Sequence, residues 1–135
     1  IRLLRDEAVL LGGEVYLYGR PDAQRPGRGV EVRKTPAELV EGLDTDKPIL
    51  VLDHQPRELE ALAAAGVDVD LCGHTHDGQM FPGNLTVRLF WENACGCLRV
   101  GSMHSIVTSG VGLFGPNMRV ATRAEICPIT IRFAG

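Results

Sequence analysis

One stretch of the sequence, Leu71-Cys72-Gly73-His74-Thr75-His76-Asp77-Gly78-Gln79, follows an apolar run and ends in a loop that contains glycine. Two histidines one residue apart at the end of a strand can turn both imidazole rings toward one point, or toward two neighbouring metal ions. Imidazole is a common ligand for zinc, manganese, iron and similar ions. By itself, a His-x-His pair is explained equally well by two polar loop residues, so the surrounding sequence has to decide.

The segments before this stretch predict that a third histidine joins the pair. Residues 49–52 form an aliphatic run typical of a strand buried on both faces, and His54 lies just beyond its end. Pro56 is expected to open a helix that ends at Gly66, and residues 67–72 predict the next strand. A right-handed crossover makes the two strands parallel neighbours whose carboxyl ends share one sheet edge. Three imidazoles are therefore expected to converge at that edge.

Several motifs together resemble the calcineurin-like metallophosphoesterase superfamily. Gly73-His74-Thr75-His76 is similar to its last motif, Gly-His-x-His, and Ile49-Leu50-Val51-Leu52-Asp53-His54-Gln55-Pro56 resembles its single-histidine motif. Its closing segment resembles Val107-Thr108-Ser109-Gly110-Val111-Gly112 and Met118-Arg119-Val120. The resemblance covers most of the chain from about Ala8 onward. The family's earlier motifs, Asp-x-His, Gly-Asp and Gly-Asn-His, do not occur in this sequence.

The resemblance implies an α/β fold in which residues 1–135 form a single domain. That domain would be the C-terminal half of a layered α/β/β/α sandwich, with mixed sheets flanked by helices. The resemblance also implies two divalent metal ions about 3.5–4 Å apart, with manganese, iron and zinc as candidates. His54 and His74 would bind the second ion and His76 the first. A bridging aspartate, an asparagine and the general-acid histidine would come from a missing N-terminal half.

The implied function is hydrolysis of phosphate mono- or diesters at a dinuclear metal site, with this chain inactive alone. One alternative is a non-catalytic metal-binding or interaction module. Another is a dimer whose partner chain contributes carboxylates, for which Asp22, Asp53 and Asp77 are the candidates. An exposed edge of the parallel sheet, normally paired with the missing half, would also favour dimerisation.

Four further residues are candidates for contacts with the substrate or with the metal ligands. Asp77 either holds a metal-bound water or caps its loop, and Asp22 either faces the site or shapes a turn. His104 either borders the site or has a structural role. Gly110 belongs to a segment that could bring backbone N–H groups near a phosphate. A loop at residues 23–29 is expected to be mobile, and Arg20, Arg25 and Arg28 would either face a phosphate or be solvated.

The remaining elements are predicted from local signals. Residues 8–11 and 14–18 read as a hairpin with a primed turn at Gly12-Gly13, and Thr35-Pro36-Ala37-Glu38 reads as a helix start with a capping box. Residues 86–91 could form a strand, a short helix or a hydrophobic lip. Their Phe90-Trp91 pair would either pack against the core, cover the site, or contact substrate or membrane. Strands of an antiparallel sheet are predicted at residues 98–100, 105–109, 118–122 and 128–133.

Composition limits the class of protein. The chain has 135 residues, a net charge of −3 and 44% hydrophobic residues, which suits one globular domain. The charge is mild and dispersed, which argues against nucleic-acid binding. No apolar run reaches the roughly 18 residues of a membrane span. Four cysteines without a zinc-type spacing favour free thiols and a reducing cytoplasm, although a segment outside the chain could tether the protein to a membrane.

Overall fold

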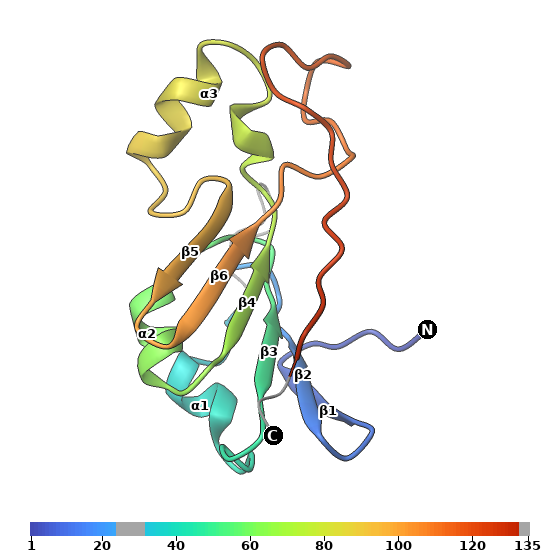
Figure 1. Ribbon diagram of the computed structural model, residues 1–135, viewed down its shortest axis with the longest axis vertical. Coiled ribbons are helices and arrows are strands. Elements are labelled where there is room, and N and C mark those ends of the chain that lie inside the picture. The colour runs from blue at the N-terminus through green and yellow to red at the C-terminus, as the bar shows by residue number, and fades with distance from the viewer. Residues whose placement is uncertain (24–31, 133–135) are drawn as a thin grey trace.

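Six strands form one mixed sheet in the computed structural model, which describes residues 1–23 and 32–132 (Figure 1). The strand order is β1-β2-β3-β4-β6-β5. β2, β3, β4 and β6 are mutually parallel, and β1 and β5 pair antiparallel at the two edges. The strands are β1 (Glu7–Leu11), β2 (Val15–Gly19), β3 (Ile49–Leu52), β4 (Val69–Cys72), β5 (Gly96–Val100) and β6 (Met103–Val107). The predicted α/β class with a mixed sheet flanked by helices is confirmed.

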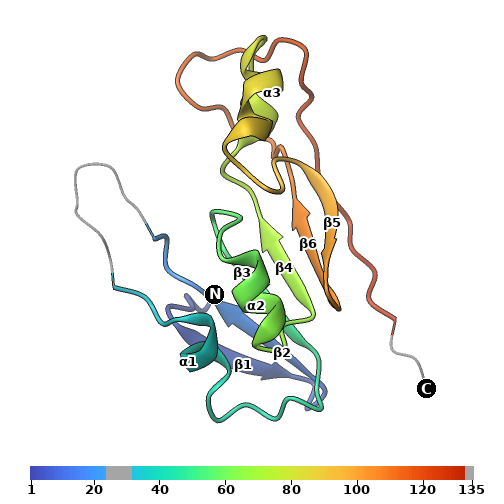
Figure 2. The same ribbon diagram turned by 90° about the vertical axis from the view of Figure 1, so that its left-hand side faces the viewer.

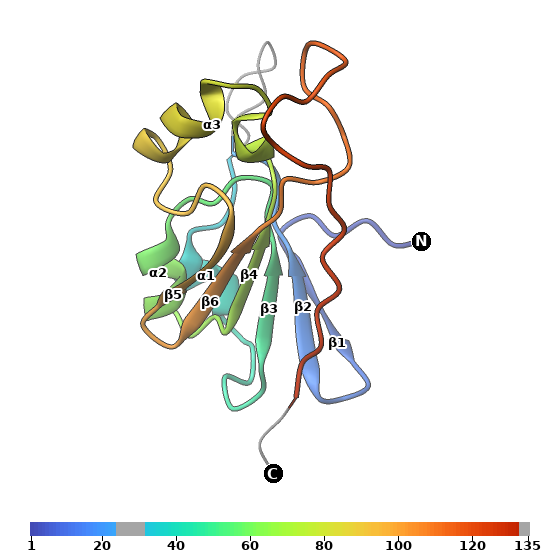
Figure 3. The same ribbon diagram turned by 45° about the horizontal axis from the view of Figure 1, so that its top comes forward.

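The sheet has a helical face and an opposite face crossed by the C-terminal segment. Helices α1 (Pro36–Val40) and α2 (Leu59–Ala64) cover the first face, and residues 118–132 run along the second (Figures 2 and 3). The core lies under the helices, where Leu39 and Leu62 pack against Ile49, Val51 and other buried side chains. Burying an aliphatic side chain of this kind stabilises the fold by about 1.5–3 kcal/mol.

Two local predictions are confirmed. Gly12 and Gly13 have φ values of 61° and 80°, as a primed hairpin turn between β1 and β2 requires. The side chain of Thr35 accepts a hydrogen bond from the backbone of Glu38, whose own side chain accepts one from the backbone of Thr35. Pro36 stands at the first helical position, so α1 begins where the capping box predicts.

The β3–α2–β4 unit is confirmed, but its helix begins later than expected. Leu50 pairs with Val69 in a parallel register, so the ends of β3 and β4 share one edge. α2 starts at Leu59 rather than near Pro56, because Glu58 adopts a left-handed conformation with a φ of 60°. The carboxylate of Glu58 is bound by two arginines from other segments, which offsets the cost of that backbone conformation.

The C-terminal strands predicted at residues 118–122 and 128–133 are absent from the described residues up to 132. This segment pairs its backbone with loops instead, as when Val120 N–H donates to the Gln79 carbonyl (3.0 Å) and Glu125 N–H to the Gly110 carbonyl (3.1 Å). Phe133 and residues 24–29 of the predicted mobile loop lie outside the described residues. The prediction of an exposed edge of parallel strands is also wrong. The parallel strands lie inside the sheet, and the antiparallel strands β1 and β5 flank them.

The segment after the His-x-His stretch is helical. Three short elements follow β4: η1 (His76–Gly78), α3 (Gly83–Thr86) and η2 (Val87–Leu89). This decides among the three interpretations of residues 86–91 in favour of a short helix. No helix in residues 1–23 and 32–132 is both long and apolar enough to cross a membrane.

Candidate metal centre

The predicted ligands stand at the carboxyl ends of two adjacent parallel strands. His54 follows β3, and His74 and His76 follow β4, at the end of the sheet where α3 lies (Figure 1). Backbone hydrogen bonds hold the two loops together: Asp53 N–H donates to the Leu71 carbonyl (3.0 Å), and Gly73 N–H donates to the His54 carbonyl (3.2 Å). The local topology therefore brings the single histidine and the His-x-His pair to one edge.

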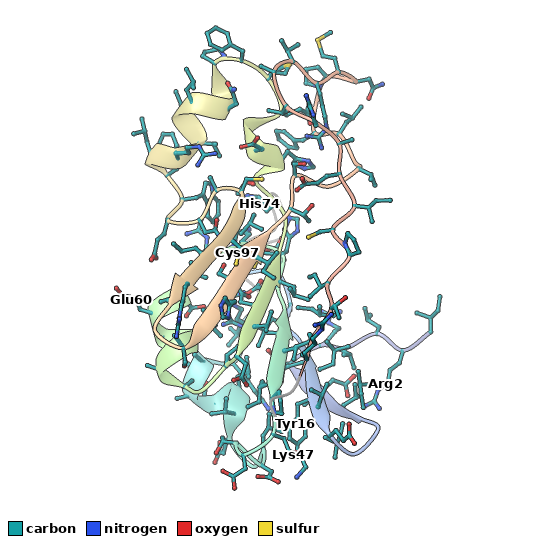
Figure 4. The ribbon with its side chains drawn as sticks, viewed as in Figure 1. Arg2, Tyr16, Lys47, Glu60, His74 and Cys97 are labelled. Carbon is teal, nitrogen blue, oxygen red and sulfur yellow. The ribbon has the colours of Figure 1, made fainter. Side chains whose placement is uncertain are left out.

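His54 and His74 meet at this edge. Nδ1 of His74 lies 3.0 Å from Nε2 of His54, and the two rings cross at 80° with centroids 4.8 Å apart. One nitrogen donates a hydrogen to the other, so at least one ring presents a lone pair at the contact. In Figure 4, His74 lies at the site end of the strands, whereas Tyr16 and Lys47 mark the opposite end.

His76 lies at the same edge, but its ring packs against Phe114 and does not take part in the contact between His54 and His74. The ring stacks on Phe114, with centroids 6.2 Å apart and planes 23° from parallel. Its Nδ1 atom is buried and has no hydrogen-bond partner among the described residues. Across that described part of the chain, no group of three His, Cys, Asp or Glu side chains is arranged to hold a metal ion. Two of the three predicted imidazoles thus make direct contact, and the third keeps an unused buried nitrogen.

Burial favours the neutral form of both histidines of the pair. Burial lowers the pKa of His74, and the nearby His54 lowers it further, while Asp22 acts in the opposite direction. Burial also lowers the pKa of His76, together with the positive charge of Arg119 and the nearby His54. A neutral imidazole is the form that can bind a metal ion.

Asp22 lies on the site side of the molecule. Its Oδ1 accepts a hydrogen bond from Gln55 Nε2 (2.8 Å), one residue after His54. Asp22 and His54 also line the same cavity of about 380 Å³, together with Arg20. Asp22 therefore lies beside His54, and its role at the site stays a prediction.

The other three candidates differ in placement. Asp77 sits in the His-x-His loop with a φ of 51°, and its backbone N–H donates to Thr75 Oγ1, as in a loop cap. Gly110 follows β6 at the site edge, but its N–H donates to Thr108 Oγ1 (3.1 Å) and is not free for a phosphate. His104 pairs with Val69 at the start of β4, because β6 runs parallel to β4 and begins at the far edge, and of its two interpretations this position favours the structural role.

An ion-pair network behind His54 was not predicted. Asp53 accepts hydrogen bonds from Arg20 (3.0 Å) and Arg33 (3.1 and 3.0 Å), and both arginines also bind Glu58. Asp53 Oδ1 in addition accepts from His54 N–H (2.7 Å). One sign of this network was present in the sequence, because Asp53 stands between a predicted buried strand and His54. Arg20 is therefore a buried structural cation rather than a phosphate-facing residue, and Arg25 and Arg28 lie outside the described residues.

Trp91 covers one side of the candidate site. Its ring lies 5.2 Å from the ring of His74, and the Arg57 guanidinium stacks over it at 4.7 Å. Phe90 beside it is 79% exposed, so packing of this pair against the core is not what the structure shows. The four cysteines are free thiols, as expected, with Cys72 buried.

Comparison with known proteins gives several relatives. A transmembrane protein with a metallophosphoesterase domain from Danio rerio is 40% identical over 115 residues, which are 81% of this chain and 25% of that protein. An uncharacterized metallophosphoesterase from Aquifex aeolicus is 33% identical over 136 residues, 99% of this chain and 52% of its own length. Another from Helicobacter pylori is 36% identical over 129 residues, 92% and 34% of the two chains. The chain therefore spans about half or less of these relatives. No family model and no solved structure matches it.

Proposed function

Because this chain belongs to the calcineurin-like metallophosphoesterase superfamily, we propose that the protein containing it hydrolyses phosphate mono- or diesters with two bound divalent metal ions. His54, His74 and His76 are the ligands that this chain supplies in the proposal. The observation that carries it is the 3.0 Å contact between imidazole nitrogens of His54 and His74 at the carboxyl edge of parallel strands. Open α/β sheets place their sites at this edge.

Two features of the residues present support a metal site. The buried Nδ1 of His76 has no hydrogen-bond partner within the described chain, which leaves one donor atom unused. Burial lowers the pKa of both His74 and His76, which favours the neutral imidazole that binds metal ions. An imidazole-rich set without thiolates suits manganese, iron or zinc, with carboxylates from the rest of the protein completing each ion.

The chain's own residues would bind and orient the reactants. Divalent ions, when bound, bind phosphate oxygens, lower the pKa of the attacking water and stabilise charge in the transition state. Arg57 places a cation near His74, where it would attract an anionic phosphate ester. Trp91 would shield that side of the site from water, since its ring contacts His74.

The rest of the protein would complete the site. The bridging carboxylate and the general acid are proposed to come from a segment outside this chain, which spans about half or less of its relatives. The Danio rerio relative is named a transmembrane protein, so membrane attachment through such a segment is a further part of the proposal. Fractionation of cells that express the full-length protein would test that part.

Metal titration with histidine variants tests the ligand set. Full-length protein is titrated calorimetrically with Mn²⁺ and Zn²⁺, beside a His74→Ala, His76→Ala double variant and a His104→Ala control. His104 is the matched control because it is the histidine at the opposite edge of the sheet. We expect the double variant to lose binding and the control to retain it. Equal binding in all three proteins would overturn the assignment.

An assay of nitrophenyl phosphate mono- and diester hydrolysis distinguishes the proposed phosphoesterase from a non-catalytic module. The alternative is a non-catalytic metal-binding or interaction module, and the lack of a three-ligand cluster within the described residues favours it over a complete catalytic site. Metal binding without hydrolysis of either ester would support that module. Hydrolysis that a chelator abolishes and added metal restores would support the phosphoesterase.

A further inference from the structure

The loop that carries the His-x-His pair is strained. His74, His76, Asp77 and Gln79 have φ values of 65°, 51°, 51° and 54°, and Gly78 has 73°. The left-handed region costs a non-glycine residue about 1–2 kcal/mol. A loop with four such residues among six relaxes unless other parts of the structure hold it. The contacts that hold it therefore also determine where His76 stands relative to His54 and His74.

One arginine from a distant segment makes the central contact. Arg119 Nη1 donates to the carbonyl of His76 (3.1 Å). Its Nη2 donates to three more carbonyls, those of Ser109 (2.7 Å), Gly110 (3.0 Å) and Gly112 (2.7 Å). A single guanidinium thus joins the backbone of His76 to the loop that follows β6. These hydrogen bonds occupy both of its terminal nitrogens, so phosphate binding is not its role here.

The C-terminal segment that contains Arg119 also forms hydrogen bonds with Gln79, at the end of the strained loop. Gln79 is 5% exposed, and its side-chain amide donates to the carbonyls of Phe114 (2.6 Å) and Pro116 (3.1 Å). Its backbone carbonyl accepts hydrogen bonds from Val120 N–H (3.0 Å) and Thr122 Oγ1 (2.9 Å). The irregular C-terminal segment therefore binds Gln79 at two points, residues 114–116 and 120–122, and Arg119 lies between them in the sequence.

We propose that Arg119 is a positioning residue for His76. By binding the His76 carbonyl and three carbonyls of residues 109–112, it holds the His74–Gln79 loop in its left-handed conformation. The planar fork of arginine suits this task because it offers several donors in fixed directions, whereas a lysine is a single flexible ammonium. The inference rests on the proposed role of His76 as a metal ligand.

Hydrogen exchange in the metal-free, full-length protein tests the clamp directly. The protected amides are those of Gly78, which donates to the Thr75 carbonyl (2.8 Å), and Gln79, which donates to the His76 carbonyl (3.0 Å). In Arg119→Met we expect exchange at these amides to accelerate about 10-fold or more, because loss of about 1.4 kcal/mol of local support changes an opening equilibrium tenfold. Arg119→Lys should lie between this variant and the wild type.

Arg99→Met is the matched control. Arg99 also binds a backbone carbonyl, that of Gly101 (3.0 Å), but in the β5–β6 turn at the far end of the sheet. It is expected to leave exchange at Gly78 and Gln79 unchanged. Exchange in Arg119→Met equal to that of the wild type would overturn the clamp. If Arg119→Met does not fold, Arg119→Lys, which keeps the charge, carries the same comparison.

Cobalt binding then tests the consequence for the metal site. Titration followed by Co²⁺ absorption should show an affinity about 10–100-fold weaker in Arg119→Met, as for other residues that orient metal ligands, and partly recovered in Arg119→Lys. Faster exchange with unchanged Co²⁺ affinity would overturn the positioning role. A wild type that binds no Co²⁺ would overturn the proposed ligand set instead, and the exchange data would still decide the clamp.

Discussion

At the scale of single residues, the burial of Asp70 makes the stability of the fold depend on pH. Its side chain lies in β4 without exposed surface, and within the described chain its Oδ1 has no hydrogen-bond partner. Burial raises the pKa of Asp70 to about 6; hydrogen bonds from Cys72 and Ser105 oppose the shift, and the charge of Asp53 adds to it. Because an unfolded aspartate titrates near about 3.9, folding favours the protonated form of Asp70.

The free energy of unfolding is therefore expected to fall as pH rises from about 4 to about 6, because the unfolded chain releases this proton first. A difference of about two pKa units corresponds to about 3 kcal/mol of stability, and this loss is complete above about pH 6. Asp70→Asn removes the titrating charge and should lose less stability than the wild type between about pH 4.5 and about pH 7.5. Urea unfolding at both pH values measures this, and an identical pH dependence would contradict it.

Asp53 fixes the loop that carries His54 through buried charge. The side chains of Asp53 and Arg20 have no exposed surface, and Arg33 is 8% exposed. Asp53→Asn leaves the buried Arg20 short of a charged partner, which is expected to lower the free energy of unfolding by about 3 kcal/mol. Asp44→Asn is the control, since the Asp44–Lys47 pair lies on the surface and its loss should not be measurable. Equal denaturation midpoints for the two variants would refute this.

At the scale of elements, the β1–β2 turn depends on one backbone conformation. Gly13 has a φ of 80° and open space where a Cβ would stand. Gly13→Ala is therefore expected to lower the free energy of unfolding by about 1 kcal/mol through backbone strain alone. Gly112 also has open space but no left-handed φ, so Gly112→Ala should be neutral or slightly stabilising. Chemical denaturation of the pair checks this, and equal losses would show that strain is not the cause.

The segment after η2 places a spectroscopic reporter beside the candidate site. Trp91 is the single tryptophan of the chain, and its ring contacts His74. Binding of Co²⁺ at His74 is expected to quench most of its fluorescence, because the Trp91 ring lies 5.2 Å from the ring that would bind the ion. His74→Ala should abolish the quenching, and His104→Ala should retain it. Quenching that persists in His74→Ala would place the ion elsewhere.

At the scale of the whole molecule, one sheet face is only partly covered. Leu71 and Ile106 line a groove of about 300 Å³ there, with Ile126 and Ile129 of the C-terminal segment on its other side. Leu52 on the same face is 39% exposed. An apolar sheet face of this kind is where the remaining part of the protein is proposed to pack.

The isolated chain is therefore expected to show no measurable hydrolysis of nitrophenyl phosphodiesters, because the proposed bridging carboxylate lies outside it. The full-length protein should hydrolyse them in the presence of Mn²⁺. The comparison uses both proteins at equal concentration with the metal in excess, and circular dichroism confirms that the isolated chain is folded. Equal activity of the two would show that residues 1–135 contain the complete site.

The sequence by itself determined those features that depend on near neighbours. The hairpin turn at Gly12-Gly13 and the capping box of α1 follow from residues within three or four positions of each other. The strand–helix–strand unit follows from apolar periodicity and the handedness of crossovers. These local rules were enough to bring His54 and His74 to one edge of the sheet.

Only the tertiary structure decided the features that depend on partners far apart in the chain. The start of α2 and the buried position of Arg20 rest on contacts with Asp53 and Glu58, 33 and 38 residues away. The place of His76 rests on Arg119, 43 residues further on. A side chain with several possible partners carries no local sign of which one it will bind. Such contacts are fixed only when packing brings the segments together.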